Sequence, residues 1–279
     1  MELIAVNYSA PDSDVQFVES LRETGFGVLK NHPIDQALVN RIYAHWTAFF
    51  AGEDKYRYRF NRERQDGYYS QDHAETAKNY HKQDIKEYYH YYPWGQCPEA
   101  LRPELQEYYE QAHRLAAELL SWIEQHSPPE VSARYSEPLS GMIDGSEQTL
   151  LRILNYPPLT GQEEGGAMRA AAHEDINLLT ILPAANVSGL QVRASDNEWI
   201  DVPCDFSNLI VNAGDMLQEA SGGYFRSTRH RVMNPKGEAR QKARMSLPLF
   251  LHPRDDVVLS KRYTAGSYLN ERLKDLRVV

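Results

Sequence analysis

The sequence predicts a mixed α and β protein with a mainly helical first half and an all-β second half. Apolar residues three or four positions apart dominate residues 1–147, which is the periodicity of amphipathic helices. From about Leu150 the chain changes to short apolar runs separated by Gly, Pro, Asn and Asp, a pattern typical of a β-sandwich, jelly roll or barrel. The chain of 279 residues is long enough for one large domain or two ordinary ones.

The first half begins with a predicted helix and a predicted strand. Polar cap residues at positions 12–14 precede a stretch with Phe17 and Leu21 on one face, and Gly25 is a C-terminal stop signal. The run FGVLK that follows, residues 26–30, is expected to form a short strand.

Two longer helices are predicted next. One begins at Asp35, and the other begins near Pro103 and is broken by the run HSPPE at residues 126–130. Their apolar stripes are Leu38, Ile42, Trp46 and Phe49 in the first of the two, and Leu105, Tyr109, Ala112, Leu115, Leu119 and Ile123 in the second.

Residues 66–95, between these two helices, form a polar and irregular segment that is rich in tyrosine. Aromatic rings in such a segment either line a substrate pocket or pack on the surface of a core. The sequence favours packing and leaves the pocket open as the alternative.

The second half contains seven candidate strands and a final helix. The strands are LLRILNY (150–156), INLLTIL (176–182), GLQVRA (189–194), EWIDVP (198–203), NLIVNAGD (208–215), FRSTRHRV (225–232) and RMSLPLFL (244–251). The run SYLNERLKDL, residues 267–276, is expected to be a short terminal helix that packs on the core.

Composition argues against several classes of function. A net charge of −9 and a pI near 5.6 disfavour a nucleic-acid partner, which requires a concentrated basic surface. The two cysteines, Cys97 and Cys204, are too few for a disulfide framework or a cysteine-based zinc site. The first residues lack the basic and apolar regions of a signal peptide, and no run of about 18 apolar residues occurs. We therefore expect a cytoplasmic protein with no membrane partner.

Three residues of the second half are predicted to form a metal site. In AAHEDINLLTIL, residues 171–182, strand alternation puts His173 and Asp175 on one face and Glu174 on the other. The same alternation turns His230 inward. Two imidazoles and one carboxylate suit the facial triad of non-haem Fe(II), which leaves three positions open for substrates and oxygen. For each residue taken alone, an ordinary structural hydrogen bond is the alternative.

A second constellation lies in ARMSLPLFLHP, where Arg244 and Ser246 share a strand face. An arginine that points into an apolar run needs an anionic partner. A guanidinium beside a hydroxyl is a good receptor for the distal carboxylate of a small diacid. The alternative is that Arg244 pairs with a structural acid such as Asp215.

In combination these residues resemble the isopenicillin N synthase-like family of iron(II)/2-oxoglutarate-dependent dioxygenases. The residues that carry the resemblance are, in order, Asn155-Tyr156-Pro157, His173-x-Asp175, His230 and Arg244-x-Ser246. The resemblance extends to ETGFGVLKNHPI near the N-terminus and to VNAGDML and YFRSTRHRV, so that it spans nearly the whole chain.

The resemblance implies a fold and a set of residue roles. The fold is a double-stranded β-helix (jelly roll) core with flanking helices, in a single domain with a mainly helical region at 1–147, a core at 148–255 and a tail and helix at 256–279. The implied roles are iron ligation by His173, Asp175 and His230, binding of the C5 carboxylate of 2-oxoglutarate by Arg244, Ser246 and Tyr156, and a border of the substrate site at Phe250.

The resemblance also implies a reaction. Fe(II), 2-oxoglutarate and O2 are the expected cofactor and cosubstrates, and a small organic substrate would be oxidised, most often hydroxylated, with release of succinate and CO2. Two alternatives remain open. One is a 2-oxoglutarate-independent iron oxidase of the same fold, which the Arg244 and Ser246 pair disfavours. The other is a non-catalytic jelly-roll protein that binds a small molecule or a metal.

Overall fold

The structure is a computed structural model, and it describes residues 3–70, 84–163, 166–185, 188–194, 196–203 and 205–275. Among the sequence-based predictions, those for Cys204, for residues 71–83 of the tyrosine-rich segment and for the chain beyond residue 275 lie outside the described residues. Cys97 is a free thiol.

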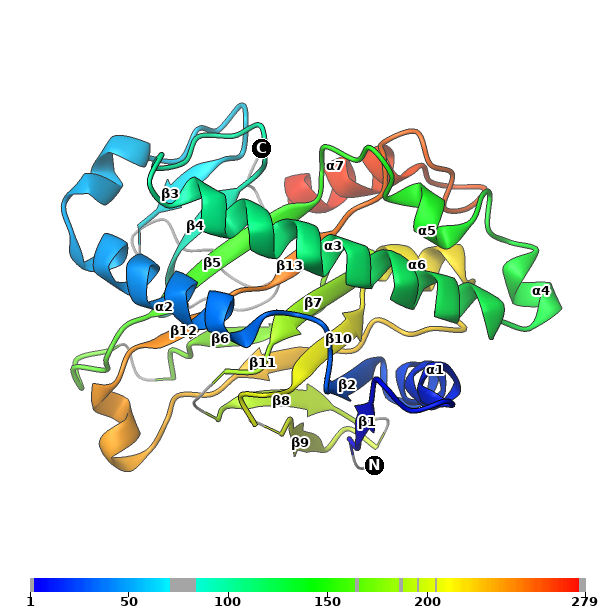
Figure 1. Ribbon diagram of the computed structural model, residues 1–279, viewed down its shortest axis with the longest axis horizontal. Coiled ribbons are helices and arrows are strands. Elements are labelled where there is room, and N and C mark those ends of the chain that lie inside the picture. The colour runs from blue at the N-terminus through cyan, green and yellow to red at the C-terminus, as the bar shows by residue number, and fades with distance from the viewer. Residues whose placement is uncertain are drawn as a thin grey trace.

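Two sheets form the centre of the described chain (Figure 1). The larger sheet has nine strands, eight of them in the order β1-β2-β10-β7-β13-β5-β4-β3 and the ninth, β12, paired with β5. The smaller sheet has four strands in the order β6-β11-β8-β9. The strands of the larger sheet are β1 (Ala5–Asn7), β2 (Phe26–Lys30), β3 (Gly67–Tyr69), β4 (Glu87–Tyr91), β5 (Leu150–Tyr156), β7 (Leu179–Pro183), β10 (Leu209–Ala213), β12 (Arg244–Ser246) and β13 (Leu249–Leu251). Those of the smaller sheet are β6 (Ala170–His173), β8 (Leu190–Arg193), β9 (Trp199–Asp201) and β11 (His230–Val232).

Apolar side chains from both sheets meet in one buried cluster, which includes Val28 and Tyr156 from the larger sheet and Val192 and Val232 from the smaller one. Strand alternation explains this, because every second residue points to the same face. The two sheets therefore enclose a common interior, which is the arrangement of the predicted double-stranded β-helix.

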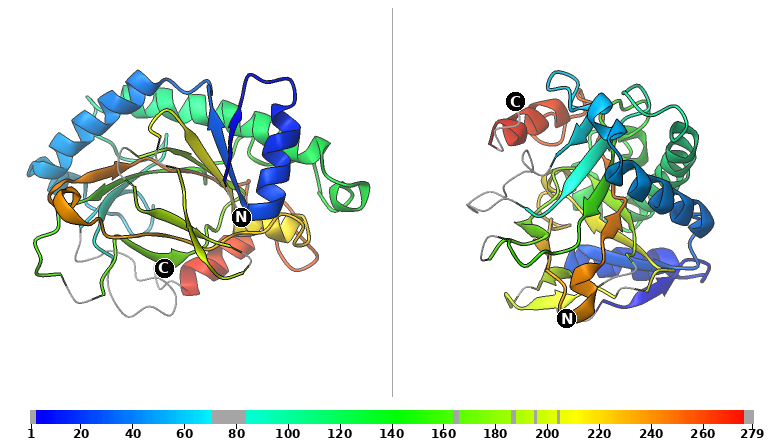
Figure 2. Two further views of the ribbon diagram at one scale, coloured as in Figure 1. Left: turned by 90° about the horizontal axis from the view of Figure 1, so that it is seen from below. Right: turned by 90° about the vertical axis from the view of Figure 1, so that its left-hand side faces the viewer.

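Helices cover the outer face of the larger sheet. Figures 1 and 2 show the two long helices α2 and α3 running side by side across it, with α1 beside β1 and β2. The helices are α1 (Ser13–Thr24), α2 (Gln36–Ala51), α3 (Arg102–Gln125), α4 (Pro129–Ser132), α5 (Leu139–Met142), α6 (Asp215–Ala220) and α7 (Ala265–Asp275), with 3-10 turns η1 (Asp54–Tyr58) and η3 (Gly237–Gln241). No helix of the described residues is long and apolar enough to cross a membrane.

The long helices begin and end where the sequence predicts. The side chain of Asp35 caps α2 by accepting a hydrogen bond from the amide of Ala37 at 2.8 Å. Gly25 ends α1 with a left-handed conformation, φ 74°. Trp46 of the α2 stripe is fully buried. One member of the α3 stripe is misplaced, because Tyr108 is fully buried whereas Tyr109 is only partly covered.

The tyrosine-rich segment was predicted to be irregular, and this is wrong for its described ends. Its two described ends form β3 and β4, which pair with each other and extend the larger sheet from β5. Tyr68, Tyr88, Tyr89 and Tyr91 are buried there. These strands were missed because both faces are covered, so apolar and polar residues do not alternate along them.

Several predicted strands differ from the observed ones in their bounds. RMSLPLFL is two strands, β12 and β13, interrupted at Pro248, because proline has no amide hydrogen to donate to a sheet. FRSTRHRV is extended only over its last three residues. In NLIVNAGD the strand ends at Ala213, and the short helix α6 follows at once.

Replacing Gly25 with alanine is expected to destabilise the protein by about 2 kcal/mol or more. A left-handed conformation alone costs a residue with a side chain roughly 1–2 kcal/mol, and the added Cβ would lie 2.7 Å from the carbonyl oxygen of Arg226 and against the side chain of Thr228. Gly52→Ala is the matched control, since its φ is −88° and its nearest contact is 3.4 Å. Urea unfolding of both variants measures the difference, and equal stability would contradict the prediction.

Candidate active site

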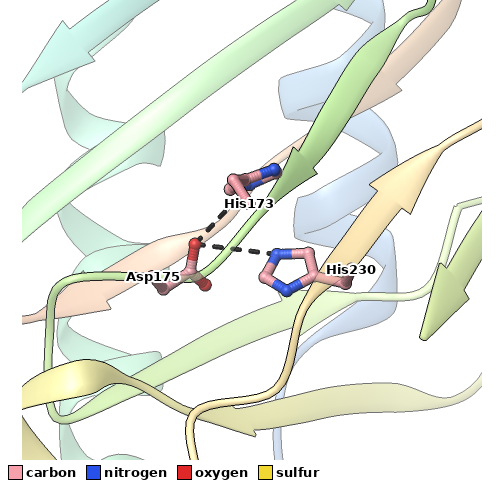
Figure 3. Close-up of side chains that lie close together, drawn as sticks. All are labelled: His173, Asp175 and His230. Atoms are coloured by element: carbon pink, nitrogen blue, oxygen red, sulfur yellow. Dashed lines mark ion pairs between the residues drawn. The ribbon is translucent and has the colours of Figure 1, made fainter. Parts of the chain in front are cut away.

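Three side chains from separate parts of the smaller sheet and its loops converge on one point (Figure 3). One carboxylate oxygen of Asp175, Oδ1, lies 3.8 Å from Nε2 of His173 and 3.6 Å from Nε2 of His230. The ligand atoms of the three residues all lie within 4.8 Å of one another. The predicted cluster is therefore present in the fold.

The backbone differs from the predicted one at this cluster. Strand β6 ends at His173, and Asp175 lies in the turn that leads to β7. The sequence suggested that alternation along one strand brings His173 and Asp175 together, and this is wrong, because Asp175 lies outside the strand. The turn brings them together, while the pairing of β6 with β11 places His230 directly opposite His173.

The backbone fixes the orientation of both imidazole rings. Nδ1 of His173 lies 2.8 Å from the carbonyl oxygen of Ala171, and Nδ1 of His230 lies 3.1 Å from that of Thr228. Since a carbonyl only accepts, each Nδ1 carries the proton and donates it. Both Nε2 lone pairs are then free to face the centre of the cluster, as metal binding requires.

Two neighbouring side chains hold the carboxylate of Asp175. Its Oδ2 accepts hydrogen bonds from Oγ1 of Thr180 at 2.6 Å and from Nδ2 of Asn212 at 2.8 Å. Burial alone would raise the pKa of Asp175, but His230, His173 and these two hydrogen bonds hold that pKa below its usual value. The carboxylate is thus ionised, with Oδ2 occupied and Oδ1 directed at the histidines.

The electrostatic state of the cluster suits a divalent cation. Burial and the neighbouring His230 lower the pKa of His173 to about 4, so that its imidazole is neutral near pH 7. Two imidazoles and one carboxylate fit non-haem Fe(II), with coordination positions left for other ligands. Glu174 is exposed and does not belong to the cluster, as predicted.

Replacing Thr180 with valine is expected to weaken metal binding by about ten- to a hundredfold, the usual effect of removing a side chain that supports a metal ligand. The change keeps the volume and removes one of the two hydrogen bonds to Oδ2 of Asp175. Anaerobic equilibrium dialysis with Fe(II) measures the affinity.

The control for this change is Thr24→Val, because Thr24 is also buried and hydrogen-bonded but lies in α1. It should reduce stability and leave the affinity for Fe(II) unaltered. Equal affinities in Thr180→Val and the wild type would show that Asp175 needs no such support.

The predicted carboxylate receptor lies on neighbouring strands of the larger sheet. Arg244 of β12 stands opposite Tyr156 of β5, and Ser246 stands opposite Leu154. Arg244, Ser246 and Tyr156 are all buried, and the guanidinium carbon of Arg244 is 5.4 Å from the centre of the Tyr156 ring. Asp215, the structural acid that the sequence left as an alternative partner, instead accepts a hydrogen bond from the hydroxyl of Tyr268 at 3.2 Å.

A pocket of about 780 Å³ opens onto the cluster. His173 and Asp175 lie on its wall, and so does Phe250, the predicted border of the substrate site. Tyr92 and Trp94, from the end of the tyrosine-rich segment, also line it. Packing and pocket lining are therefore both present in that segment, in different residues.

Sequence reasoning missed several residues around the site. Arg152 lies on the pocket wall with its guanidinium carbon 4.7 Å from the ring centre of Tyr88 and 5.4 Å from that of Phe250. His252 also lines the pocket, and burial lowers its pKa to about 4. An arginine in the strand LLRILNY was a visible signal, since a charged residue in an otherwise apolar run calls for a partner or a function.

Two family models match the chain. The model of the 2OG-Fe(II) oxygenase superfamily matches residues 148–253. The model of the N-terminal region of non-haem dioxygenases in morphine synthesis matches residues 9–113. The two matches cover the all-β core and most of the helical region respectively.

Relatives match along almost the full chain. A crystal structure of a Shewanella oneidensis protein, provisionally described as an oxygenase, is 60% identical over 100% of both chains, with a TM-score of 0.90. Gibberellin 2-beta-dioxygenase 2 of Arabidopsis thaliana is 24% identical over 96% of this chain and 84% of its own length. Isopenicillin N synthase of Amycolatopsis lactamdurans is 24% identical over 89% of this chain and 81% of its own.

Proposed function

The chain belongs to the 2OG-Fe(II) oxygenase superfamily and is an Fe(II)- and 2-oxoglutarate-dependent oxygenase, and from this premise we propose that it hydroxylates a small organic molecule with release of succinate and CO2. The observation that carries the proposal is the convergence of His173, Asp175 and His230, of which His173 and Asp175 line a pocket large enough for a small molecule. The oxidising power comes from the iron together with O2 and 2-oxoglutarate, and the protein supplies position and environment.

His173, Asp175 and His230 are proposed to hold the iron. The fixed Nδ1–H donors and the occupied Oδ2 of Asp175 leave one ligand atom from each residue facing the same point. Such support from the surrounding shell keeps the ligands in place before the metal arrives.

Arg244, Ser246 and Tyr156 are proposed to bind the C5 carboxylate of 2-oxoglutarate. A guanidinium and two hydroxyl groups donate hydrogen bonds to carboxylate oxygens, and such charge-assisted bonds are roughly twice as strong as neutral ones. All three side chains are buried, so that water competes little for the carboxylate. The receptor therefore selects a diacid and fixes its orientation toward the iron.

The substrate is proposed to occupy the pocket in front of His173 and Asp175. Its wall is both aromatic, with Tyr92, Trp94 and Phe250, and charged, with an ion pair of 2.9 Å between Lys86 and Asp84. Fixed polar groups on an apolar wall are typical of sites that orient a small ligand.

The cytoplasmic location expected from the sequence stays a prediction.

The test is anaerobic addition of Fe(II) and 2-oxoglutarate to the metal-free protein. A 2-oxo acid chelated to Fe(II) gives a visible charge-transfer absorption, which we expect in the wild type and not in His230→Ala. After O2 is admitted, succinate should form as 2-oxoglutarate is consumed. Tight iron binding without this absorption, together with O2 uptake that does not depend on 2-oxoglutarate, would instead support an oxidase of the same fold.

A further inference from the structure

Arg169, which precedes strand β6, is a fully buried arginine that forms no ion pair with any other described residue. Its exposed fraction is 0%. Nη2 donates a hydrogen bond to the carbonyl oxygen of Lys242 at 3.0 Å, while Nε and Nη1 are buried and have no hydrogen-bond partner among the described residues. No carboxylate in the part of the chain that the structure describes forms an ion pair with it.

A buried charge of this kind is costly unless something compensates it. Removing an ion from water costs several kcal/mol even after the protein relaxes, and buried charges are as a rule paired. The hydrogen bond to Lys242 uses one of the guanidinium nitrogens and brings no negative charge. The aromatic ring of Tyr156, 5.9 Å from the guanidinium carbon, offsets only part of the cost, since such a contact contributes about 2 kcal/mol when water is excluded and burying the charge costs several.

Arg169 shares this ring with Arg244. The guanidinium carbon of Arg244 lies 5.4 Å from the centre of the Tyr156 ring, so two cations approach one aromatic side chain in the interior between the sheets. Burial and the positive charge of Arg244 lower the pKa of Arg169 to about 10. Arg169 is therefore still charged at neutral pH, and a second guanidinium so close to it favours an anion between the two.

We propose that Arg169 is a second cationic contact for the distal carboxylate of 2-oxoglutarate, at the receptor formed by Arg244, Ser246 and Tyr156. This inference rests on the proposed function, because it takes the same ligand at the same end of the site. A carboxylate has two oxygens and about four acceptor positions, which is enough for both guanidinium groups, the serine hydroxyl and the tyrosine hydroxyl. The second arginine makes the receptor selective for 2-oxo acids with a negatively charged distal end.

The assignment predicts opposite effects on stability and on binding. If Arg169 had a structural role, its replacement would lower the thermal unfolding temperature. A ligand-binding arginine without a counter-ion should behave differently, because its removal relieves an uncompensated charge. Arg169→Met, which keeps an unbranched apolar chain, is therefore expected to have an unfolding temperature at or above that of the wild type in the ligand-free state.

The experiment is calorimetric titration of the Mn(II)-loaded protein with 2-oxoglutarate and with 2-oxovalerate. Mn(II) replaces Fe(II) so that the protein binds these acids without catalysing the reaction. 2-Oxovalerate has the same 2-oxo acid end and an uncharged distal end. Arg169→Met should weaken 2-oxoglutarate binding by roughly ten- to a hundredfold, as expected for one lost hydrogen bond to a charged group. It should leave 2-oxovalerate binding unchanged, and Arg169→Lys should restore part of the affinity for 2-oxoglutarate.

The matched control is Arg193→Met. Arg193 is a partly buried arginine of β8 whose Nε also has no hydrogen-bond partner within the described ranges, but its guanidinium lies over Trp199 and not over Tyr156. Its replacement should leave both affinities as they are.

Unchanged binding of 2-oxoglutarate in Arg169→Met would overturn the assignment of Arg169 alone. Equal weakening for both acids, or a lowered unfolding temperature with unchanged selectivity, would likewise show a structural role. A wild-type protein that binds neither acid would remove the proposed function, and this inference with it.

Discussion

Replacing His230 with alanine is expected to abolish tight Fe(II) binding and turnover while the fold is retained. The substitution removes one of three ligand atoms that lie within 4.8 Å of one another. Loss of a supporting side chain costs a metal site about ten- to a hundredfold in affinity, so loss of a ligand should cost more than about a hundredfold. The ring packs edge-on against Phe26 at 5.6 Å between centroids, so a moderate loss of stability is also expected.

Anaerobic Fe(II) dialysis and succinate release measure these effects, with circular dichroism to verify the fold. His173→Ala should behave in the same way, since its Nε2 faces the same carboxylate oxygen. The control is His45→Ala, because His45 is an exposed residue whose ring bonds to Glu104 at 2.8 Å, away from the cluster. Full turnover by His230→Ala or His173→Ala in metal-free buffer would show that the cluster is not the catalytic centre.

Replacing Arg244 with methionine is expected to raise the KM for 2-oxoglutarate by roughly ten- to a hundredfold, the effect of losing a hydrogen bond to a charged group. Metal binding should not change, because Arg244 lies on β12 and none of the three proposed ligands does. At saturating 2-oxoglutarate the rate should approach that of the wild type, since the arginine holds the cosubstrate and takes no part in bond breaking.

Initial rates of succinate formation at a series of 2-oxoglutarate concentrations test this prediction. Ser246→Ala should show a smaller increase in KM, because it removes a neutral donor. Arg22→Met is the control, since Arg22 is exposed on α1, where it pairs with Glu23. If KM is the same in Arg244→Met and in the wild type, the carboxylate receptor has been assigned to the wrong residues.

Local sequence determined the helices and the chemical character of the site. The helical stripes and their ends depend on hydrogen bonds and side-chain contacts within four residues, which is why the Asp35 cap and the Gly25 stop could be identified in advance. Residue types likewise carry their chemistry with them. Two histidines and an aspartate indicated a metal site before any distance was known. An arginine in an apolar run, with a serine two residues later, indicated a receptor for a diacid.

Tertiary structure decided how these groups meet. Strand pairing is set by hydrogen bonds between residues far apart in the chain, and the sequence does not state the register. Pairing of β6 with β11 places His230 opposite His173, and pairing of β5 with β12 places Arg244 opposite Tyr156. The turn after β6, and not strand alternation, directs Asp175 at the histidines.

The surroundings of the site were likewise decided by long-range packing. Thr180 and Asn212 are ordinary strand residues in the sequence, yet the pairing of β7 with β10 places both of them on one oxygen of Asp175. In the sequence Arg169 is one arginine among many, and only the fold buries it beside Tyr156 with two nitrogens that have no hydrogen-bond partner in the described part of the chain. Burial and hydrogen-bond satisfaction belong to the folded chain as a whole, so the sequence alone determined which groups are present and the fold determined which of them act together.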